Sequence, residues 1–335
     1  MTKLIIQIPC YQEEETLAVT LAPLPRQLPG IDCIEWLVID DGSRDATVEV
    51  ARQCGVDHIV RLSHNQGLAR AFAAGLEASL QAGADIIVNT DADNQYLADD
   101  IPKLIEPILS GKAEIVIGAR PIDQIEHFSP SKKMLQRLGS WVVRLASSTN
   151  VSDAPSGFRA MTRDAAMRMN VFNNYTYTLE TIIQAGQNGF MITSVPIRTN
   201  DYLRPSRLVT GVPSYLKRSL FTILRIFMIY QPLRFFLWMG SVPFTIGFLL
   251  GVRWLVLYLG GTPRTHVPSL ILASLLMLIG VQLGVLGLIA DLLSVNRKML
   301  EDVQLRMRRF QYDAEKAPRT ASTIYNEVEA AGRKQ

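Results

Sequence analysis

The sequence predicts an α/β fold with a Rossmann-like, mostly parallel sheet, followed by two membrane-spanning helices. Three observations support this prediction. In residues 1–200, short apolar runs with the composition of strands alternate with helical patterns, which is typical of a doubly wound sheet. Polar motifs follow several of these runs, and such sheets bind ligands at the carboxyl ends of their strands. Residues 235–293 are mostly apolar, as membrane-spanning segments are.

Composition limits the classes of protein that fit. A chain of 335 residues is long enough for two structural units. Its net charge of +3 gives no strong field that would indicate a nucleic-acid partner. Cys10, Cys33 and Cys54 lack the spacing of a metal site, so we expect free thiols in a reducing compartment. We expect no signal peptide, because the first strand pattern begins directly after Lys3.

The predicted strands and helices alternate along the first half of the chain. Runs rich in Val, Ile and Leu read as strands that are buried on both faces. The predicted strand and helix pairs are 4–8 with 14–27, 34–39 with 46–54, 58–62 with 68–82, and 86–89 with 97–109, and a last strand covers 114–117.

A pair of carboxylates follows the predicted strand at 86–89. Asp91 and Asp93 are spaced two residues apart, and Gln95 adds an amide oxygen. Two carboxylates at a strand end can meet one cation if the chain turns there. Hard oxygen ligands suit Mg²⁺ or Mn²⁺ better than Zn²⁺. The alternative is a solvated loop with an Asn turn.

The ends of the first two predicted strands also carry polar groups. Pro9 is expected to end the first strand, Tyr11 can stack on a base or ribose, and Glu13 follows. The alternative is a helix N-terminus whose acids favour the helix dipole. Asp41 can accept a hydrogen bond from a nucleobase N–H. The alternative there is an Asp-Gly turn with Asp45 as the helix cap.

A third motif follows the predicted strand at 58–62. Gly67 allows the backbone to approach a ligand closely, and Arg70 can reach a phosphate. The alternative is an ordinary loop and a surface arginine, which we favour slightly for Arg70.

Four motifs therefore stand in a fixed order at strand ends. They are Pro9-x-Tyr11-x-Glu13, Asp40-Asp41-Gly42-Ser43, Asn65-x-Gly67-Leu68 and Asp91-x-Asp93-x-Gln95. The ordered set resembles glycosyltransferase family 2, the inverting group with the GT-A fold. Within it, the set resembles most the polyprenyl-phosphate glycosyltransferases, such as dolichol-phosphate mannose synthase. Later matches are Gly118-Ala119-Arg120 and the run from Asp153 to Arg159. Gln12 is a mild departure, since Asn is commoner there.

The resemblance implies roles for these residues. Pro9, Tyr11, Glu13 and Asp41 would hold the nucleoside of a nucleotide sugar. Asp91, Asp93 and Gln95 would hold Mg²⁺ or Mn²⁺ against the diphosphate, so Asp93 counts among the catalytic residues. Arg120 would lie near the donor phosphates. Asp153 is the candidate for a carboxylate on the catalytic side, and its alternative role is an Asx turn.

The acceptor side is expected near the membrane. Arg204, Ser206 and Arg207 form a compact set of phosphate donors. The alternative is a basic surface loop, but a membrane segment follows, which favours phosphate binding. By the resemblance, residues 121–133 would form an acceptor or lid loop.

Two uncharged runs predict the membrane anchor. Residues 235–252 hold 18 residues without a charge, about 27 Å of helix, and residues 267–290 hold 24. Gln282 lies within the second run, where it would face a helix neighbour or another subunit, so a homo-oligomer stays open. We divide the chain into a GT-A catalytic domain at 1–210, an interfacial amphipathic helix at 211–232, a two-helix transmembrane domain at 233–293 and a cytoplasmic tail at 294–335.

Charge around the two runs predicts their orientation. Lys and Arg gather before the first run and after the second. Between the runs, Arg253 directly follows the first, and only Arg264 lies in the connecting loop proper. The positive-inside rule then places the catalytic domain and both termini in the cytoplasm.

These inferences predict a metal-dependent, inverting hexosyltransferase. It would move a sugar from a UDP- or GDP-sugar, with UDP favoured, to a polyprenyl phosphate on the cytoplasmic leaflet. One alternative acceptor is a lipid hydroxyl or a polysaccharide. Polysaccharide synthases usually carry a Gln-x-x-Arg-Trp motif and more spans, and neither is visible. A second alternative is a membrane subunit that binds nucleotide sugar without catalysis. The sequence leaves the sugar and the lipid length open.

Overall fold

The computed structural model describes residues 1–121, 144, 149, 151–171, 177–200, 224–225, 227–260 and 267–316. The proposed acceptor set of Arg204, Ser206 and Arg207 lies outside these residues. The loop beyond residue 121 and residues 211–223 of the expected interfacial helix also lie outside them.

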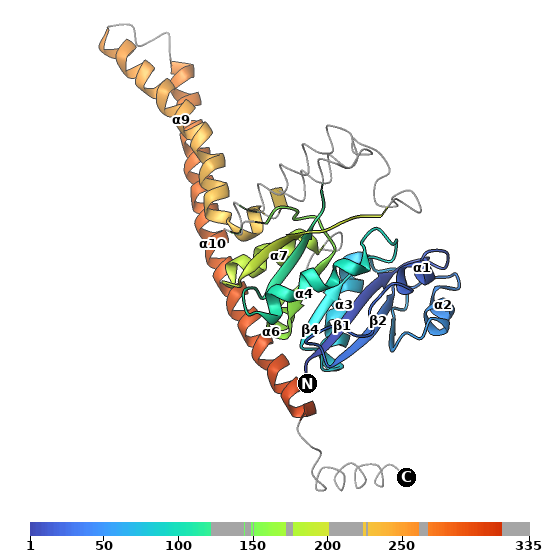
Figure 1. The fold of residues 1–335 in the computed structure, drawn as a ribbon. Coiled ribbons are helices and arrows are strands. Elements are labelled where there is room, and N and C mark those ends of the chain that lie inside the picture. The colour runs from blue at the N-terminus through green and yellow to red at the C-terminus, as the bar shows by residue number, and fades with distance from the viewer. Residues whose placement is uncertain are drawn as a thin grey trace, which may run out of the picture.

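A seven-stranded sheet forms the centre of the globular domain, in the order β3-β2-β1-β4-β6-β5-β7 (Figure 1). Among the strands that the structure describes, only β6 runs antiparallel to its neighbours, β4 and β5. The sheet is therefore mostly parallel, as the sequence predicts. The strands are β1 (Lys3–Cys10), β2 (Cys33–Asp40), β3 (His58–Arg61), β4 (Ile86–Asn89), β5 (Ile115–Ala119), β6 (Arg159–Thr162) and β7 (Ile192–Pro196).

Helices cover both faces of this sheet. Successive strand residues point to opposite faces, so Ile5 and Ile87 join one core while Ile6 and Val88 join the other. The first core is closed by α3, α6 and α7, and the second by α1, α2 and α4. The bounds are α1 (Leu17–Leu21), α2 (Thr47–Gln53), α3 (Leu68–Gln81), the 3₁₀ helix η1 (Ala98–Asp100), α4 (Ile101–Leu109), α6 (Arg163–Arg168) and α7 (Thr178–Gln187).

Two details of the first β-α unit differ from the prediction. The helix expected at 14–27 is only α1, because Pro23 and Pro25 follow it and lack the backbone N–H that a helix needs. Pro9 lies inside β1, opposite Ile39, and does not end the strand. Gln7 and Pro9 share the β4 side of β1, and the pairing with β4 ends at Gln7. The missing N–H of Pro9 therefore breaks no ladder hydrogen bond.

Two long helices follow the domain, α9 (Pro232–Leu259) and α10 (Val267–Lys316). Both are long and apolar enough to cross a membrane. They pack side by side, and the paired part projects away from the sheet (Figure 1). The contact is close because glycines meet at it: a Cβ on Gly240 would lie 2.8 Å from the carbonyl oxygen of Gly280.

The second helix continues without a break past residue 293, where the sequence suggests the start of a tail, and lies against the globular domain. Arg308 donates hydrogen bonds to the carbonyl oxygens of Met167 and Met169, at 2.9 and 3.2 Å. Arg309 pairs with Asp164 of α6 at 2.5 Å. The basic residues of this segment therefore attach α10 to the domain.

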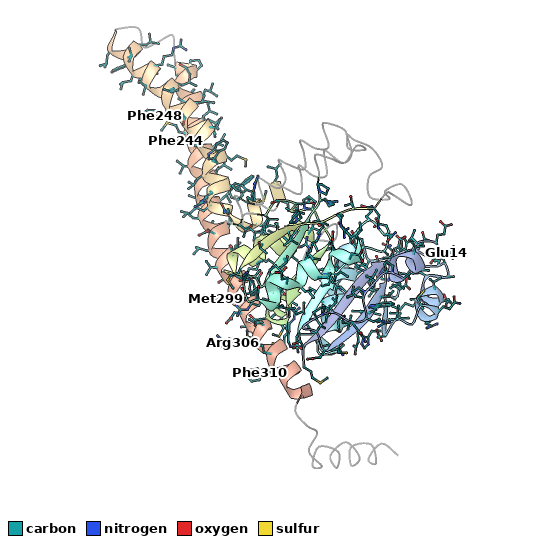
Figure 2. All side chains as sticks on the ribbon, viewed as in Figure 1. Glu14, Phe244, Phe248, Met299, Arg306 and Phe310 are labelled. Carbon is teal, nitrogen blue, oxygen red and sulfur yellow. The ribbon has the colours of Figure 1, made fainter. Side chains whose placement is uncertain are left out.

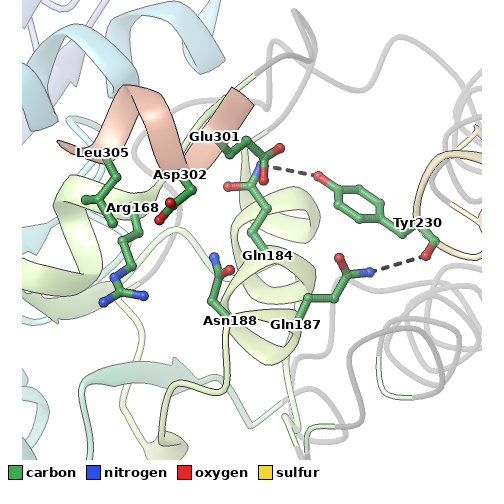
Figure 3. A pocket seen from close by; sticks show the side chains of 8 residues that line it. All are labelled: Arg168, Gln184, Gln187, Asn188, Tyr230, Glu301, Asp302 and Leu305. Carbon is green, nitrogen blue, oxygen red and sulfur yellow. Dashed lines mark hydrogen bonds between the residues drawn. The ribbon is translucent and has the colours of Figure 1, made fainter. Parts of the chain in front are cut away.

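A polar joint lies where α7, α10 and the start of α9 meet (Figure 3). Tyr230 is buried there. Its hydroxyl accepts a hydrogen bond from Gln184 at 3.2 Å, and its carbonyl oxygen accepts one from Gln187 at 3.3 Å. The joint encloses a cavity of about 120 Å³, lined by Arg168, Gln184, Gln187, Asn188, Tyr230, Glu301, Asp302 and Leu305. This packing fixes the globular domain to the base of the helical hairpin.

Candidate active site

The predicted motifs gather at one edge of the sheet. Strands β2, β1 and β4 are neighbours and parallel, and they end at Asp40, Cys10 and Asn89. The segments that follow them carry the polar motifs, so the fold brings these motifs to the edge where doubly wound sheets bind ligands.

The turn after β4 holds the carboxylate pair. Asn94 takes a left-handed conformation with φ of 56°, which reverses the chain. The backbone N–H and side-chain amide of Gln95 then donate to Asp93, at 3.2 and 2.7 Å. The carbonyl oxygen of Ala92 accepts from the Thr20 hydroxyl at 3.0 Å. Gln95, which the sequence suggests as a metal ligand, here orients Asp93.

Asp91 carries the clearest electrostatic signal of the site. Burial and the adjacent Asp93 carboxylate raise the pKa of Asp91 to about 7, against the opposing effect of Arg120. Two carboxylates that disfavour each other's charge in this way are the groups whose repulsion a cation relieves. Gly157 packs directly on Asp91, since a Cβ there would lie 2.9 Å from both carboxylate oxygens.

The donor set suits a cation that is shared with a substrate. Among the described residues, no group of three His, Cys, Asp or Glu side chains could hold a metal ion. Mg²⁺ is commonly held by one or two carboxylates together with substrate phosphates and water. Asp91 and Asp93 therefore fit the expected ion if a diphosphate supplies further oxygens.

Arg120 and Asp153, which the sequence places in separate roles, form one ion pair. Arg120 Nε and Nη2 donate to the two carboxylate oxygens of Asp153, at 2.7 and 3.1 Å. The backbone N–H of Arg120 adds a bond of 3.2 Å. Asp153 is fully buried. This two-pronged geometry fixes the guanidinium, so Asp153 is better placed to orient Arg120 than to remove a proton from a substrate.

A pocket of about 430 Å³ opens beside the carboxyl ends of β1, β2 and β3. Tyr11 lines it, together with residues of the loop that follows β2, the last residue of β3 and the loop beyond it. These residues are Gly42, Ser43, Arg44, Arg61, Leu62, Ser63, His64 and Asn65. A half-buried aromatic ring beside basic and amide side chains suits a nucleoside.

Asp41 has a role that the sequence does not reveal. Its two carboxylate oxygens accept hydrogen bonds from the backbone N–H groups of Gln66 and Gly67, at 2.7 and 2.9 Å. At Gly42 a Cβ would lie 2.5 Å from the carbonyl carbon of His64. Asp41 and Gly42 therefore hold the loop at 64–67 that forms one wall of the pocket.

Three further candidates have different surroundings. Glu13 is buried, accepts from the Thr16 hydroxyl at 2.6 Å, and its backbone N–H donates to Thr47 at 2.9 Å. Gly67 caps α3 with a φ of 93° that favours glycine. Arg70 is exposed on α3. Glu13 and Gly67 thus shape the loops at the sheet edge, while Arg70 is solvent-facing.

A buried polar network beneath the carboxylates escaped the sequence analysis. Asn89 is fully buried and accepts from the Gln7 side chain at 2.9 Å. It donates to the Gly157 carbonyl oxygen and to the Tyr177 hydroxyl, both at 2.9 Å. Nearby, the buried Arg159 bonds the Thr181 hydroxyl at 2.6 Å. The only signal in the sequence is a polar residue at the end of an apolar strand, which does not reveal its partners.

Comparison with protein families gives one match that covers half of the chain. The model of the family described as Glycosyl transferase family 2 matches residues 5–173. That range contains the carboxylate turn, the pocket and the Arg120–Asp153 pair.

Several relatives are named as sugar transferases. An undecaprenyl-phosphate mannosyltransferase of Micrococcus luteus is 30% identical over 200 residues, 57% of this chain and 80% of that protein. An undecaprenyl-phosphate 4-deoxy-4-formamido-L-arabinose transferase of Pectobacterium carotovorum is 28% identical over 318 residues, 91% of each chain. A UDP-N-acetylglucosamine–dolichyl-phosphate N-acetylglucosaminyltransferase of Methanococcus voltae is 31% identical over 214 residues, 57% and 83% of the two chains.

A solved structure shares the fold. Glucosyl-3-phosphoglycerate synthase from Mycobacterium tuberculosis, in complex with Mn²⁺, UDP and glucosyl-3-phosphoglycerate, superposes with a TM-score of 0.52 at 19% identity. The match covers 68% of this chain and 79% of that one. At this identity the likeness supports the predicted GT-A-like fold alone.

Proposed function

The chain belongs to glycosyl transferase family 2, and from this premise we propose that it transfers a sugar from a nucleotide sugar to a polyprenyl phosphate in the membrane. The products are a polyprenyl-phosphate sugar and a nucleoside diphosphate. One observation carries the proposal: a carboxylate pair at the ligand-binding edge of the sheet and two helices able to cross a membrane belong to one chain. The names of the three relatives agree with this acceptor class.

The donor half of the site is assigned to the sheet edge. Tyr11 stacks on the base or ribose in the pocket whose wall Asp41 supports. Asp91 and Asp93 would hold Mg²⁺ or Mn²⁺, with Gln95 orienting Asp93. When bound there, such a cation would supply positive charge that stabilises the leaving nucleoside diphosphate. Arg120, fixed by Asp153, adds a positive charge on the same side.

The acceptor half needs no strong base. A phosphate monoester has its second pKa near about 6, so its oxygen is already anionic at neutral pH. Transfer to a hydroxyl would require a group that takes the proton as the bond forms. Asp153 is closed off by Arg120, which fits the phosphate acceptor better. Attack opposite the leaving diphosphate inverts the sugar's anomeric configuration, and Arg204, Ser206 and Arg207 are proposed to bind the acceptor phosphate.

We assign the globular domain and both termini to the cytoplasmic side of the membrane. The support is the excess of Lys and Arg on the flanks of the two apolar helices. An engineered thiol at Ser63, which is exposed beside the pocket, should resist impermeant reagents in sealed cells and react after lysis. Labelling from outside intact cells contradicts the assignment.

A donor panel tests the activity itself. The purified protein in lipid is given UDP- and GDP-sugars together with a polyprenyl phosphate, and the lipid is extracted for mass determination. We expect one polyprenyl-phosphate sugar, made from a UDP-sugar. A glycosylated lipid hydroxyl or polysaccharide instead would favour the other acceptor classes. Nucleotide-sugar binding without any product would favour a non-catalytic subunit.

A further inference from the structure

The turn that carries Asp91 and Asp93 is bordered by a second segment, residues 197–200, which directly follows β7. This segment runs beside residues 94–100, although the contacting residues lie 98 to 106 positions apart in the chain. The sequence predicts no functional role for residues 197–200. The fold nevertheless places them against the loop that holds the carboxylate pair, so their contacts bear on the geometry of that pair.

Arg198 and Thr199 anchor this segment. The backbone N–H of Arg198 donates to Oδ2 of Asp100 at 2.7 Å, and Nη2 of the same residue donates to Oδ1 at 2.8 Å. Asp100 is fully buried, so its carboxylate gives the segment a fixed point. Thr199 and Tyr96 form an isolated antiparallel bridge. Both contacts set the position of the residue that follows, Asn200.

Asn200 binds two consecutive peptide groups of the turn. Its side-chain amide donates to the carbonyl oxygen of Asn94, and its backbone N–H donates to the carbonyl oxygen of Gln95, both at 2.9 Å. Asn94 is the residue whose left-handed backbone reverses the chain. Either peptide group can therefore rotate only by breaking a hydrogen bond to Asn200.

The first of these peptide groups also points at Asp93. A peptide group is planar, and in the trans form its carbonyl oxygen and its N–H point in opposite directions. The carbonyl oxygen of Asn94 and the N–H of Gln95 belong to the same group. Asn200 holds the oxygen on one side, and on the other side the N–H donates to Asp93 Oδ1 at 3.2 Å. The direction of that N–H is thus set by Asn200.

We propose that Asn200 is a positioning residue for Asp93. By fixing the peptide group between residues 94 and 95, it keeps the Gln95 N–H on Asp93 and holds that carboxylate in place for the cation that Asp91 and Asp93 would share. Groups that orient metal ligands from outside the ligand set contribute to metal affinity. The inference rests on the proposed function, because it presumes the metal site, and it adds a residue outside the four sequence motifs.

Asn200 suits substitution because it is exposed. Asn200→Ala removes the side-chain hydrogen bond and keeps the backbone one, and water can solvate the carbonyl oxygen that is left, so the domain should stay folded. Thr199→Val is the matched control, since Thr199 meets Tyr96 through its backbone, which this change leaves in place. The part of the hairpin that carries Phe244 and Phe248 lies well away from the sheet (Figure 2), so neither variant should disturb the membrane anchor.

Hydrogen exchange of the metal-free chain in nanodiscs tests the contact itself. In Asn200→Ala we expect fragments that cover residues 91–96, and the Gln95 amide above all, to exchange at least about threefold faster, the effect of losing one modest hydrogen bond. Thr199→Val should exchange as the wild type does. Unchanged exchange in Asn200→Ala, or equal changes in both variants, overturns the proposal.

Binding of Mn²⁺ tests the consequence for the metal site. The ion is titrated into the full chain in nanodiscs at a fixed concentration of UDP or GDP, with empty nanodiscs as the blank. Asn200→Ala should raise the dissociation constant of Mn²⁺ by about 3- to 10-fold, and Thr199→Val should leave it unchanged. A wild-type chain that binds no Mn²⁺ contradicts the proposed function and the inference together, whereas wild-type affinity in Asn200→Ala overturns the inference alone.

Discussion

Gly157→Ala should damage the active site through one atom. The Ala methyl would lie 2.9 Å from each Asp91 carboxylate oxygen, whereas ordinary contact begins near 3.4 Å. The carboxylate must therefore retreat by about 0.5 Å, and the backbone of residue 157 needs no strain because its φ lies outside the left-handed region. A misplacement of about 1 Å can cost about 10²-fold in rate, so we expect kcat to fall by about 10- to 100-fold.

The assay is sugar transfer at saturating donor and acceptor, repeated over a range of Mg²⁺ or Mn²⁺ concentrations. A displaced Asp91 should raise the metal concentration needed for half-maximal rate, which a purely structural defect would not do. Thermal unfolding of the same samples should show the modest loss of stability typical of an overpacked site, about 1–3 kcal/mol.

One control separates the two groups that the new methyl would meet. The added methyl group would also lie 3.1 Å from the Tyr177 hydroxyl. Gly157→Ala is therefore repeated on a Tyr177→Phe background. We expect the same fold-loss there as in the wild type, because the contact with Asp91 remains. Wild-type kinetics for Gly157→Ala, or full rescue by Tyr177→Phe, refute the reasoning.

Three further predictions address the rest of the chain. Asp153→Asn should lose activity yet keep a flat pH–rate profile above about pH 7, whereas a mutant rate that climbs tenfold per pH unit would mark Asp153 as a true base. Arg204→Ala and Arg207→Ala should each raise the acceptor KM by about tenfold or more, the equivalent of about 1.5–3 kcal/mol per charge-assisted bond; a raised donor KM alone would move them to the diphosphate. Gly280→Ala should destabilise the helical hairpin by about 1–3 kcal/mol in micelle unfolding, because its Cβ would meet the facing helix at 2.6 Å. Gly284→Ala, whose Cβ would meet only a side chain at 3.9 Å, should not, and equal shifts would contradict the packing.

The sheet was predictable because its signal is local. Apolar runs such as the one at residues 86–88 are short, buried and separated by helical patterns, which is the sequence pattern typical of parallel sheets. The edge that carries Asp91 and Asp93 follows from topology, since parallel strands end together. The two apolar helices follow from the lack of charge over their spans.

Other features depend on contacts between distant residues. Asn89 is one residue beyond an apolar run, but its partners Gly157 and Tyr177 lie 68 and 88 residues away. From the sequence, Asp41 could accept a hydrogen bond from a nucleobase. In the fold, the loop at 64–67 lies beside it and donates hydrogen bonds to both of its carboxylate oxygens. Arg120 and Asp153 are likewise joined across 33 residues.

The length of α10 shows a different difficulty. The charged residues after Ala290 resemble a tail when only hydropathy is considered. They continue the helix because one side of this segment packs on the globular domain through Leu305 and Arg308. A helix that leaves the membrane changes its surroundings without changing its backbone, so a search for uncharged spans ends too early.

The rate of sugar transfer by the Asp93→Ala variant is the measurement that tests the central claim most directly. The wild-type protein in lipid should move labelled sugar to polyprenyl phosphate in the presence of Mg²⁺ or Mn²⁺ and stop in EDTA. The mutant should retain its fold and membrane insertion but lose at least about 10²-fold in rate. Wild-type rates from the mutant, or full wild-type activity in EDTA, would show that the carboxylate pair after β4 is not the metal-dependent centre of the reaction.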